Sequence, residues 1–349
     1  MIDWDVARAT ASRLAGKGPQ LAPHEAADVV AELREAAARS GPLVRDFTGL
    51  HTPAGASDAP VLVVDRARWS EANVASFATL LAPVLDDLAA QNRAPALVQG
   101  VGSRVSGAEV GAVLAFMAGK VLGQFDPFWT GPQGEGGRLL LVAPNIVHVE
   151  QTLRVDPHDF RLWVCLHEET HRVQFTAVPW MREHLRSLIG ELTAATDLGS
   201  EALQRFLSEG LGELARVVRG ESDASLTDLL QNDEQRAVIA RITAVMSLLE
   251  GHADVVMDGV GPEVIGSVAT IRRRFDQRRK GASGLDRIVR RLLGLESKMR
   301  QYRDGAVFVR GVVDAVGMDG FNAVWTSPDH LPTPDEIADP AAWVARVHG

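Results

Sequence analysis

The chain has 349 residues, of which 46% are hydrophobic, and a formal net charge of -9. This length and composition fit one large domain or two small ones with a sizeable core. A single cysteine, Cys165, excludes an intrachain disulfide and fits a reducing compartment.

The chain shows no pattern that would send it to a membrane or out of the cell. The first residues lack the charged, apolar and small-residue regions of a secretory signal. The longest apolar stretch, residues 110–123, is too short to span a bilayer and contains Lys120. We therefore expect a cytoplasmic protein with no membrane partner.

Helical patterns dominate the chain. Apolar residues recur at helical spacing in six segments. These segments are residues 23–40, 70–91, 106–123, 157–178, 233–249 and 296–316. Pro83 is expected to kink or break the second helix.

Two segments read as strands. One is the apolar run Val61–Val64. The other, residues 138–145, follows a loop at 131–137 that is rich in turn formers, and Pro144 would confine it to a sheet edge or a strand end. We predict an α+β fold that is predominantly α-helical, with a small sheet.

No internal repeat or low-complexity linker divides the sequence, so residues 1–349 are expected to form a single unit. Within this unit, we expect an N-terminal helical lobe of residues 1–135 to pack on a second lobe of residues 136–349.

The most informative stretch is His167-Glu168-Glu169-Thr170-His171, which reads H-E-x-x-H, the signature of zinc-dependent hydrolases. Histidines four residues apart on a helix point the same way. Glu168 lies about 100° round the helix from His167, beside the metal, where it suits a base that takes a proton from metal-bound water. The alternative is a solvated helix face with incidental histidines.

The sequence around this motif favours the metal site. Asp156 is a predicted N-cap, Pro157 suits the first helical position, and Pro179 marks the expected end of the helix. The segment between them is unusually apolar for a surface helix. Polar side chains on a core helix need partners, and a metal ion is a partner for histidines.

A catalytic zinc ion takes three protein ligands and a water molecule. Glu250 and Asp254 lie four residues apart near the end of a predicted helix, so they share one face. Glu250 could bind the metal while Asp254 accepts a hydrogen bond from a ligand histidine. Gly251 would let a facing helix approach closely.

His252 is the alternative third ligand. It lies roughly 200° round the helix from Glu250, so both side chains cannot face one metal ion. A helix-packing residue is the other interpretation of His252.

H-E-x-x-H followed on a second helix by E-x-x-x-D resembles the gluzincin branch of the zincin metallopeptidases, the branch of thermolysin. The wider chain is similar to a family of uncharacterised bacterial zincin-like proteins that are labelled zinc-dependent metalloproteases. Some of these are described as associated with deazaflavin-coenzyme biosynthesis. The matching segments are residues 60–65, 125–127, 167–171, 250–254 and 317–325.

The resemblance implies a zincin-like core with Zn²⁺ on His167, His171 and Glu250. It implies Glu168 as the general base and Asp254 as a hydrogen-bond partner of a ligand histidine. In thermolysin-like enzymes an asparagine precedes the glutamate ligand, and here that position is Leu249.

The resemblance also implies an edge strand before the metal helix that pairs with an extended substrate. Here that strand would be residues 138–145, with Ala143 and Asn145 as candidate substrate-binding residues. Such backbone pairing binds peptides with little sequence preference. An ordinary edge strand is the alternative.

Tyr302, the only tyrosine, lies in the predicted helix over residues 296–316. A phenol near zinc can stabilise a developing oxyanion, so Tyr302 is a candidate catalytic residue. The alternative is a core residue with its hydroxyl at the rim.

Three functions compete. The first is a zinc metallopeptidase that acts on a peptide or protein substrate. The second is a zinc-binding protein without turnover, in a binding or regulatory role. A nucleic-acid binder that uses the basic residues 272–280 ranks last, because the chain is acidic overall and these residues suit a helix C-terminus. We expect no nucleic-acid partner, and the patterns predict no particular oligomeric state.

Overall fold

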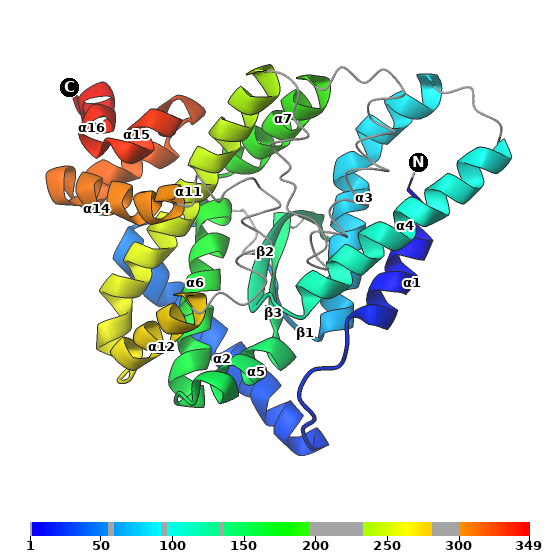
Figure 1. The fold of residues 1–349 in the computed structure, drawn as a ribbon. Coiled ribbons are helices and arrows are strands. Elements are labelled where there is room, and N and C mark those ends of the chain that lie inside the picture. The colour runs from blue at the N-terminus through cyan, green and yellow to red at the C-terminus, as the bar shows by residue number, and fades with distance from the viewer. Residues whose placement is uncertain (1, 55–58, 92–95, 133–135, 196–232, 281–299) are drawn as a thin grey trace.

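A three-stranded sheet lies between two groups of helices (Figure 1). The computed structural model describes residues 2–54, 59–91, 96–132, 136–195, 233–280 and 300–349. The strands are β1 (Val61–Val64), β2 (Gly123–Thr130) and β3 (Gly136–Val142), in the order β1-β3-β2. Strand β3 is central, pairing in parallel with β1 and antiparallel with β2.

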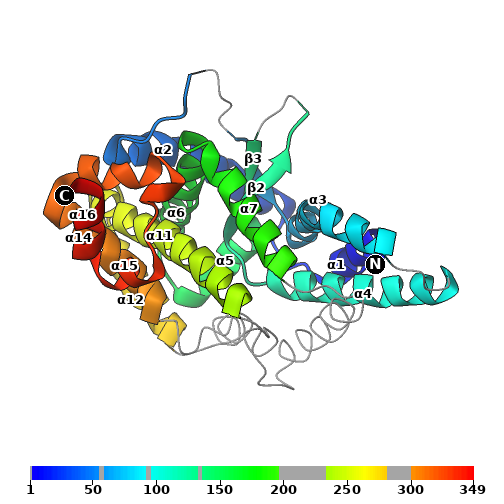
Figure 2. The ribbon, with the colours of Figure 1, turned by 90° about the horizontal axis from the view of Figure 1, so that it is seen from above.

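One group of helices covers one face of the sheet and consists of α1 (Trp4–Leu14), α3 (Arg66–Gln91) and α4 (Ala96–Ala118). The other group is built around three helices, namely α2 (Pro23–Thr48), α6 (Pro157–Ala177) and α11 (Asp233–Val264). The views from the front and from above place α6 and α11 side by side (Figures 1 and 2).

The remaining helices surround the second group. They are α5 (Ala143–Leu153), α7 (Trp180–Ala195), α12 (Val268–Lys280), α14 (Arg300–Phe321), α15 (Pro334–Ala338) and α16 (Pro340–His348), with short 3₁₀ turns at Asn322–Trp325 and Pro328–His330. Within the described ranges, no helix has both the length and the apolar composition that a bilayer span requires.

Strand β3 is buried on both faces. Successive side chains of a strand point to opposite faces. Leu139 and Leu141 pack in the core with α2, α6 and α11, whereas Leu140 and Val142 pack in the core with α1, α3 and α4. A strand covered on both sides needs no polar alternation, which explains the continuous apolar run in the sequence.

The predicted fold class, a predominantly helical α+β fold with a small sheet, is confirmed. The predicted strand over residues 61–64 is β1. The helix predicted over residues 23–40 continues through Pro42 to Thr48 and ends at Gly49, which has a left-handed φ of 68°. A break at Pro83 is wrong, because α3 continues through it to Gln91, whereas a kink at that position stays a prediction. The division into two lobes at residue 135 stays a prediction.

The prediction of an edge strand over residues 138–145 is wrong in two respects. Strand β3 ends at Val142, so Ala143 and Asn145 lie in the first turn of α5, where a proline such as Pro144 is well tolerated. Strand β3 is also the central strand, because β2 occupies its other side. Ala143 and Asn145 therefore cannot be the substrate-pairing residues.

Asn145 instead has a structural position between α5 and α4. Its Oδ1 accepts from Nε of Arg66 at 2.7 Å, and its Nδ2 donates to the carbonyls of Ala118 and Val121 at 2.7 and 2.6 Å. The side chain is buried, and these bonds use both ends of its amide. Asn145 thus ties α5 to the turn that leads into β2.

Strand β2 is the strand of the sheet that the sequence analysis missed. The helix predicted over residues 106–123 ends at Ala118, and Gly123 is the first residue of β2. Pro127 lies within β2 and is compatible with an edge strand. A backbone N–H that points away from the neighbouring strand makes no hydrogen bond in the sheet, so proline can replace it there.

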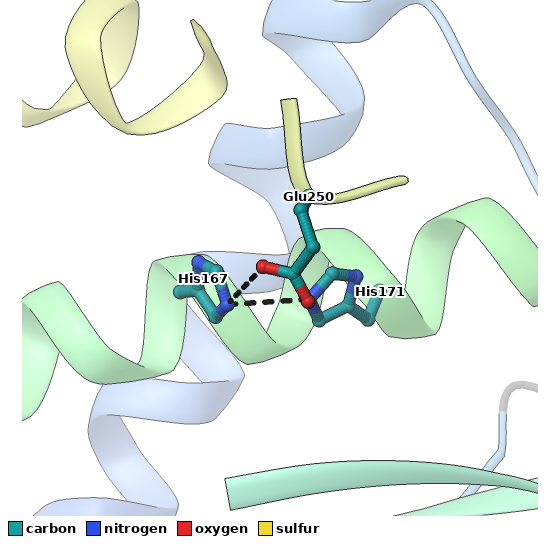
Figure 3. Close-up of side chains that lie close together, drawn as sticks. All are labelled: His167, His171 and Glu250. Carbon is teal, nitrogen blue, oxygen red and sulfur yellow. Dashed lines mark hydrogen bonds and ion pairs between the residues drawn. The ribbon is translucent and has the colours of Figure 1, made fainter. Parts of the chain in front are cut away.

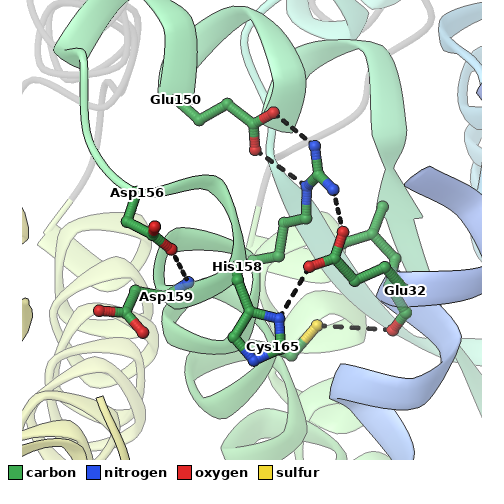
Figure 4. A network of polar contacts seen from close by, with 8 residues as sticks. Glu32, Glu150, Asp156, His158, Asp159 and Cys165 are labelled. Atoms are coloured by element: carbon green, nitrogen blue, oxygen red, sulfur yellow. Dashed lines mark hydrogen bonds and ion pairs between the residues drawn. The ribbon is translucent and has the colours of Figure 1, made fainter. Parts of the chain in front are cut away.

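Helix α6 begins and ends as predicted. The side chain of Asp156 accepts from the N–H of Asp159 at 2.9 Å, and the helix ends at Ala177, before Pro179. Near its start, Arg161 lies between two carboxylates, donating to Glu150 at 2.6 and 3.0 Å and to Glu32 of α2 (Figure 4). These ion pairs fix α6 against α5 and α2.

Cys165 lies on the same buried side of α6. Its Sγ is 3.8 Å from the carbonyl of Leu33, and the residue has no exposed surface (Figure 4). Burial raises the pKa of the Cys165 thiol well above its usual value, which disfavours the reactive thiolate. Cys165 is therefore a small buried residue of the core.

Candidate metal centre

Three side chains from two helices converge in Figure 3. His167 and His171 lie one turn apart on α6, and their Nε2 atoms are 3.2 Å apart. Glu250 reaches them from α11, with Oε2 at 3.7 Å from Nε2 of His167 and Oε1 at 3.6 Å from Nε2 of His171. Among the described residues, these three form the group of metal-binding residue types whose ligand atoms all lie within 4.8 Å of one another.

The spacing of the donor atoms fits a tetrahedral zinc ion. When a zinc ion binds nitrogen and oxygen atoms in a tetrahedral arrangement, neighbouring donor atoms lie about 3.3 Å apart. The separations of 3.2, 3.6 and 3.7 Å are close to that value. Two imidazoles and one carboxylate also form a donor set that catalytic zinc sites use, with the fourth position left for water or substrate.

Helix α11 is held in place beside the site by a close crossing with α14. A Cβ atom at Gly251 would lie 2.2 Å from the carbonyl carbon of Gly305, and one at Gly305 would lie 2.1 Å from the carbonyl oxygen of Ser247. Real side chains cannot approach backbone atoms so closely. The glycine next to Glu250 therefore permits the close helix approach that the sequence suggested, and the facing helix is α14.

Glu168 is buried beside the first residue of β2. A Cβ atom at Gly123 would lie 2.5 Å from Cδ and 2.8 Å from Oε1 of Glu168. Burial, together with the charges of Glu250 and Glu169, raises the pKa of Glu168 to about 8. The space that Gly123 leaves is therefore filled by the carboxyl group of the predicted base.

This pKa predicts that Glu168→Gln stabilises the metal-free protein, and more so at pH 8 than at pH 5. The folded carboxyl has a pKa of about 8 against 4.5 for an ordinary glutamate, so between these values the folded state binds a proton that the unfolded state releases. The free energy of unfolding therefore falls as pH rises through this window, and glutamine carries no such cost. Thermal melts of both proteins in chelator at the two pH values measure the effect. An equal gain at pH 5 and pH 8 would contradict it.

Gln174 is a residue at the site that the sequence analysis missed. It has no exposed surface, it lies three residues after His171 on α6, and its side chain contacts His171, Leu249 and His252. The sequence could have indicated that Gln174 lies beside His171, because residues three apart on a helix are neighbours. A glutamine on an apolar helix also requires polar partners.

His252, the alternative third ligand, lies outside the convergent group. It is fully buried, its ring centroid is 5.4 Å from that of Phe321 and 5.3 Å from that of Trp325, and its Nδ1 is 3.0 Å from Nε2 of Gln174. Burial, with a smaller contribution from His171, lowers the pKa of His252 to about 3. These contacts describe a neutral packing residue.

The structure leaves the roles of Asp254 and Tyr302 as predictions. Asp254 lies one turn after Glu250 on α11, and its backbone carbonyl accepts from Arg272 at 3.2 Å. Tyr302 lies in α14, and its side chain is outside the part of the chain whose side chains are described.

Two arginines of the basic stretch take part in contacts between helices. Arg272 is 2.7 Å from a carboxylate oxygen of Asp258 on α11. Arg274 donates to the carbonyls of Leu153, at 2.8 Å, and Arg154, which end α5. A cation at the C-terminal carbonyls of a helix is favourable, so Arg274 stabilises the end of α5. Both arginines therefore have structural partners.

Comparison with known proteins agrees with the geometry. A family model described as zincin-like metallopeptidase matches residues 2–344. The chain is also similar to a solved structure from Chloroflexus aurantiacus, described as a proposed hydrolase with a novel fold, with 33% sequence identity and a TM-score of 0.70. That match covers 99% of this chain and 98% of the other. None of the curated proteins matches this chain.

Proposed function

The chain belongs to the zincin-like metallopeptidase family, and we propose that it is a zinc-dependent peptidase. The observation that carries the proposal is the convergence of His167, His171 and Glu250 next to the buried carboxyl group of Glu168. The likeness to a proposed hydrolase supports hydrolysis in general. A zinc-binding protein without turnover is the alternative.

The residues of the site would share the reaction between them. His167, His171 and Glu250 would hold a zinc ion, which when bound lowers the pKa of a coordinated water to about 7 and polarises the scissile carbonyl. Glu168 would accept a proton at its carboxylate and return it to the leaving amine. Burial raises the pKa of Glu168, and a zinc ion bound beside it would lower that pKa. These opposed effects would suit a group that both accepts and releases a proton near neutral pH.

Two further residues belong to the proposal. Since Gln174 already contacts His171, Asp254 is proposed as the hydrogen-bond partner of His167. Tyr302 is proposed to donate to the oxyanion that develops on the substrate.

Strand β2 is the edge at which we propose that the substrate binds. The N–H of Val142 donates to the carbonyl of Leu122 at 2.8 Å, and bonded positions alternate along an antiparallel pair. Gln124 therefore bonds to β3, whereas Gly123 and Phe125 direct their backbone N–H and C=O groups away from it. An extended peptide that pairs with these groups would reach the Glu168 carboxyl at Gly123.

Gly123→Ala is expected to lower kcat/KM about 100-fold without loss of zinc, because the new methyl group displaces the Glu168 carboxyl and misplacement of about 1 Å can cost that much. The matched control is Gly190→Ala on α7, where an added Cβ meets nothing within 4 Å. Peptide hydrolysis and zinc content are measured on both variants. Full activity of Gly123→Ala would contradict the position assigned to the base.

Cleavage of a complex peptide mixture tests the proposed activity while the substrate is still unidentified. The zinc-loaded protein is incubated with a digest of a whole proteome, and new peptide ends are identified by mass spectrometry. We expect new ends that disappear when chelator is added. If the zinc-loaded protein produces none, the peptidase proposal is wrong and the zinc-binding alternative is favoured.

A further inference from the structure

We propose that Gln174 is a positioning residue that keeps the proton of His171 on Nδ1 and fixes α6 to α11 on both sides of Glu250. The inference rests on the proposed metal site, but not on peptide turnover.

Both ends of the Gln174 amide make hydrogen bonds where α6 packs on α11. Nε2 donates to the carbonyl of Leu249 at 2.9 Å and lies 3.0 Å from Nδ1 of His252. Oε1 lies 2.9 Å from Nδ1 of His171. Leu249 and His252 stand on either side of Glu250 in the chain, so one buried side chain links a ligand on α6 to the segment that carries the ligand on α11.

The partners of Gln174 determine where the protons lie. A backbone carbonyl can only accept, so the atom that faces Leu249 must be the NH₂ group and the atom that faces His171 must be the amide oxygen. An amide oxygen can only accept, so Nδ1 of His171 must carry the proton. A neutral imidazole has one proton, which leaves the lone pair of Nε2 for the metal.

The NH₂ end of the Gln174 amide gives the buried ring of His252 a hydrogen-bond partner. Because the NH₂ group of Gln174 donates to it, Nδ1 of His252 must be an acceptor, and its ring packs against the rings of Phe321 and Trp325. His252 therefore acts on the site through Gln174 and not as a ligand. A glutamate at position 174 would place a second acceptor against the carbonyl of Leu249 and Nδ1 of His252, which leaves buried groups unsatisfied.

Zinc affinity tests this role without a substrate. The variant is Gln174→Met, which keeps the length of the side chain and removes its hydrogen bonds. The control is Thr170→Val, a buried position on the same helix whose hydroxyl donates to the carbonyl of Leu166 at 2.8 Å. Competition with a chromophoric chelator should show zinc binding weakened about 10- to 100-fold in Gln174→Met, as for other residues that orient metal ligands, and unchanged in Thr170→Val. Equal affinities in all three proteins would overturn the inference.

The tautomer of His171 in the metal-free wild-type protein is a second and independent readout. Long-range ¹⁵N–¹H NMR at pH 8, where ordinary imidazoles are neutral, should show the proton on Nδ1. A proton on Nε2 would overturn the inference even if Gln174→Met does not fold. If the wild-type protein binds no zinc or cleaves no peptide, the proposed function fails while the tautomer still decides the role of Gln174.

Discussion

Glu168→Gln is expected to lower kcat/KM for peptide hydrolysis by about 10³-fold or more, since a general base typically contributes 10²- to 10⁴-fold. Glutamine has nearly the shape of glutamate but cannot accept the proton. Glu168 is not among the three residues whose ligand atoms converge, so the variant should keep its zinc. Steady-state kinetics on a peptide that the wild-type protein cleaves, together with zinc content, measure both effects.

The neighbouring residue provides the matched control for this experiment. Glu169→Gln makes the same chemical change one position along α6, where the carboxylate is buried and accepts from Nε of Arg172 at 2.7 Å. Its folded fraction, checked by thermal melts, should hydrolyse the peptide at close to the wild-type rate. An active Glu168→Gln protein would contradict the mechanism, and an inactive Glu169→Gln protein would show that the loss is not specific to Glu168.

The pairing of His167 with His171 was predictable because it depends on local helix geometry. The four-residue spacing of His167 and His171, with the Asp156 cap upstream, requires only that residues 157–177 form a helix. Glu250 could be named only as a candidate, from its spacing to Asp254 and from the resemblance, with His252 left open as the alternative. Its approach to the two histidines depends on the packing of α11 on α6, which the sequence of neither helix shows.

The open edge of the sheet, where we propose that substrate binds, could not be predicted, because the position of a strand in a sheet depends on its neighbours. Residues 138–142 read as a strand, but nothing in their own sequence shows that β2 lies beside them. The sequence of β2 does not read as a strand, because it begins with a glycine and contains Pro127, and both residue types are unfavourable in strands. The open edge was therefore assigned to β3, and the close approach of Gly123 to Glu168 was missed.

The partner of His171 was missed for a different reason. The resemblance directed attention to Asp254, on the second helix, whereas the side chain found beside His171 is Gln174 on the same helix. A glutamine three residues after a candidate ligand histidine is visible in the sequence, but its burial is not. Its partners, Leu249 and His252, become visible only when the packing of α6 on α11 is known.

Glu250→Ala is expected to weaken zinc binding by about 10³-fold or more, because it removes one of three protein ligands from a site that needs all of them. Hydrolysis should be lost with the metal. The side chain of Glu250 is 37% exposed, and the helices that carry the ligands are held by a large buried core, so the metal-free variant should remain folded. Zinc titration and thermal melts in chelator measure the two properties separately.

The control is Glu263→Ala, the same substitution at an exposed position of α11, which should bind zinc as the wild-type protein does. The melts also separate a catalytic ion from a structural one. A structural zinc site supplies folding free energy, so its removal would unfold the chain. If zinc-free Glu250→Ala melts cooperatively near the melting temperature of the zinc-free wild-type protein, the fold does not need the metal ion. That result would favour a catalytic zinc ion. Loss of the fold would instead favour a zinc ion that serves structure, and unchanged zinc affinity would remove Glu250 from the ligand set.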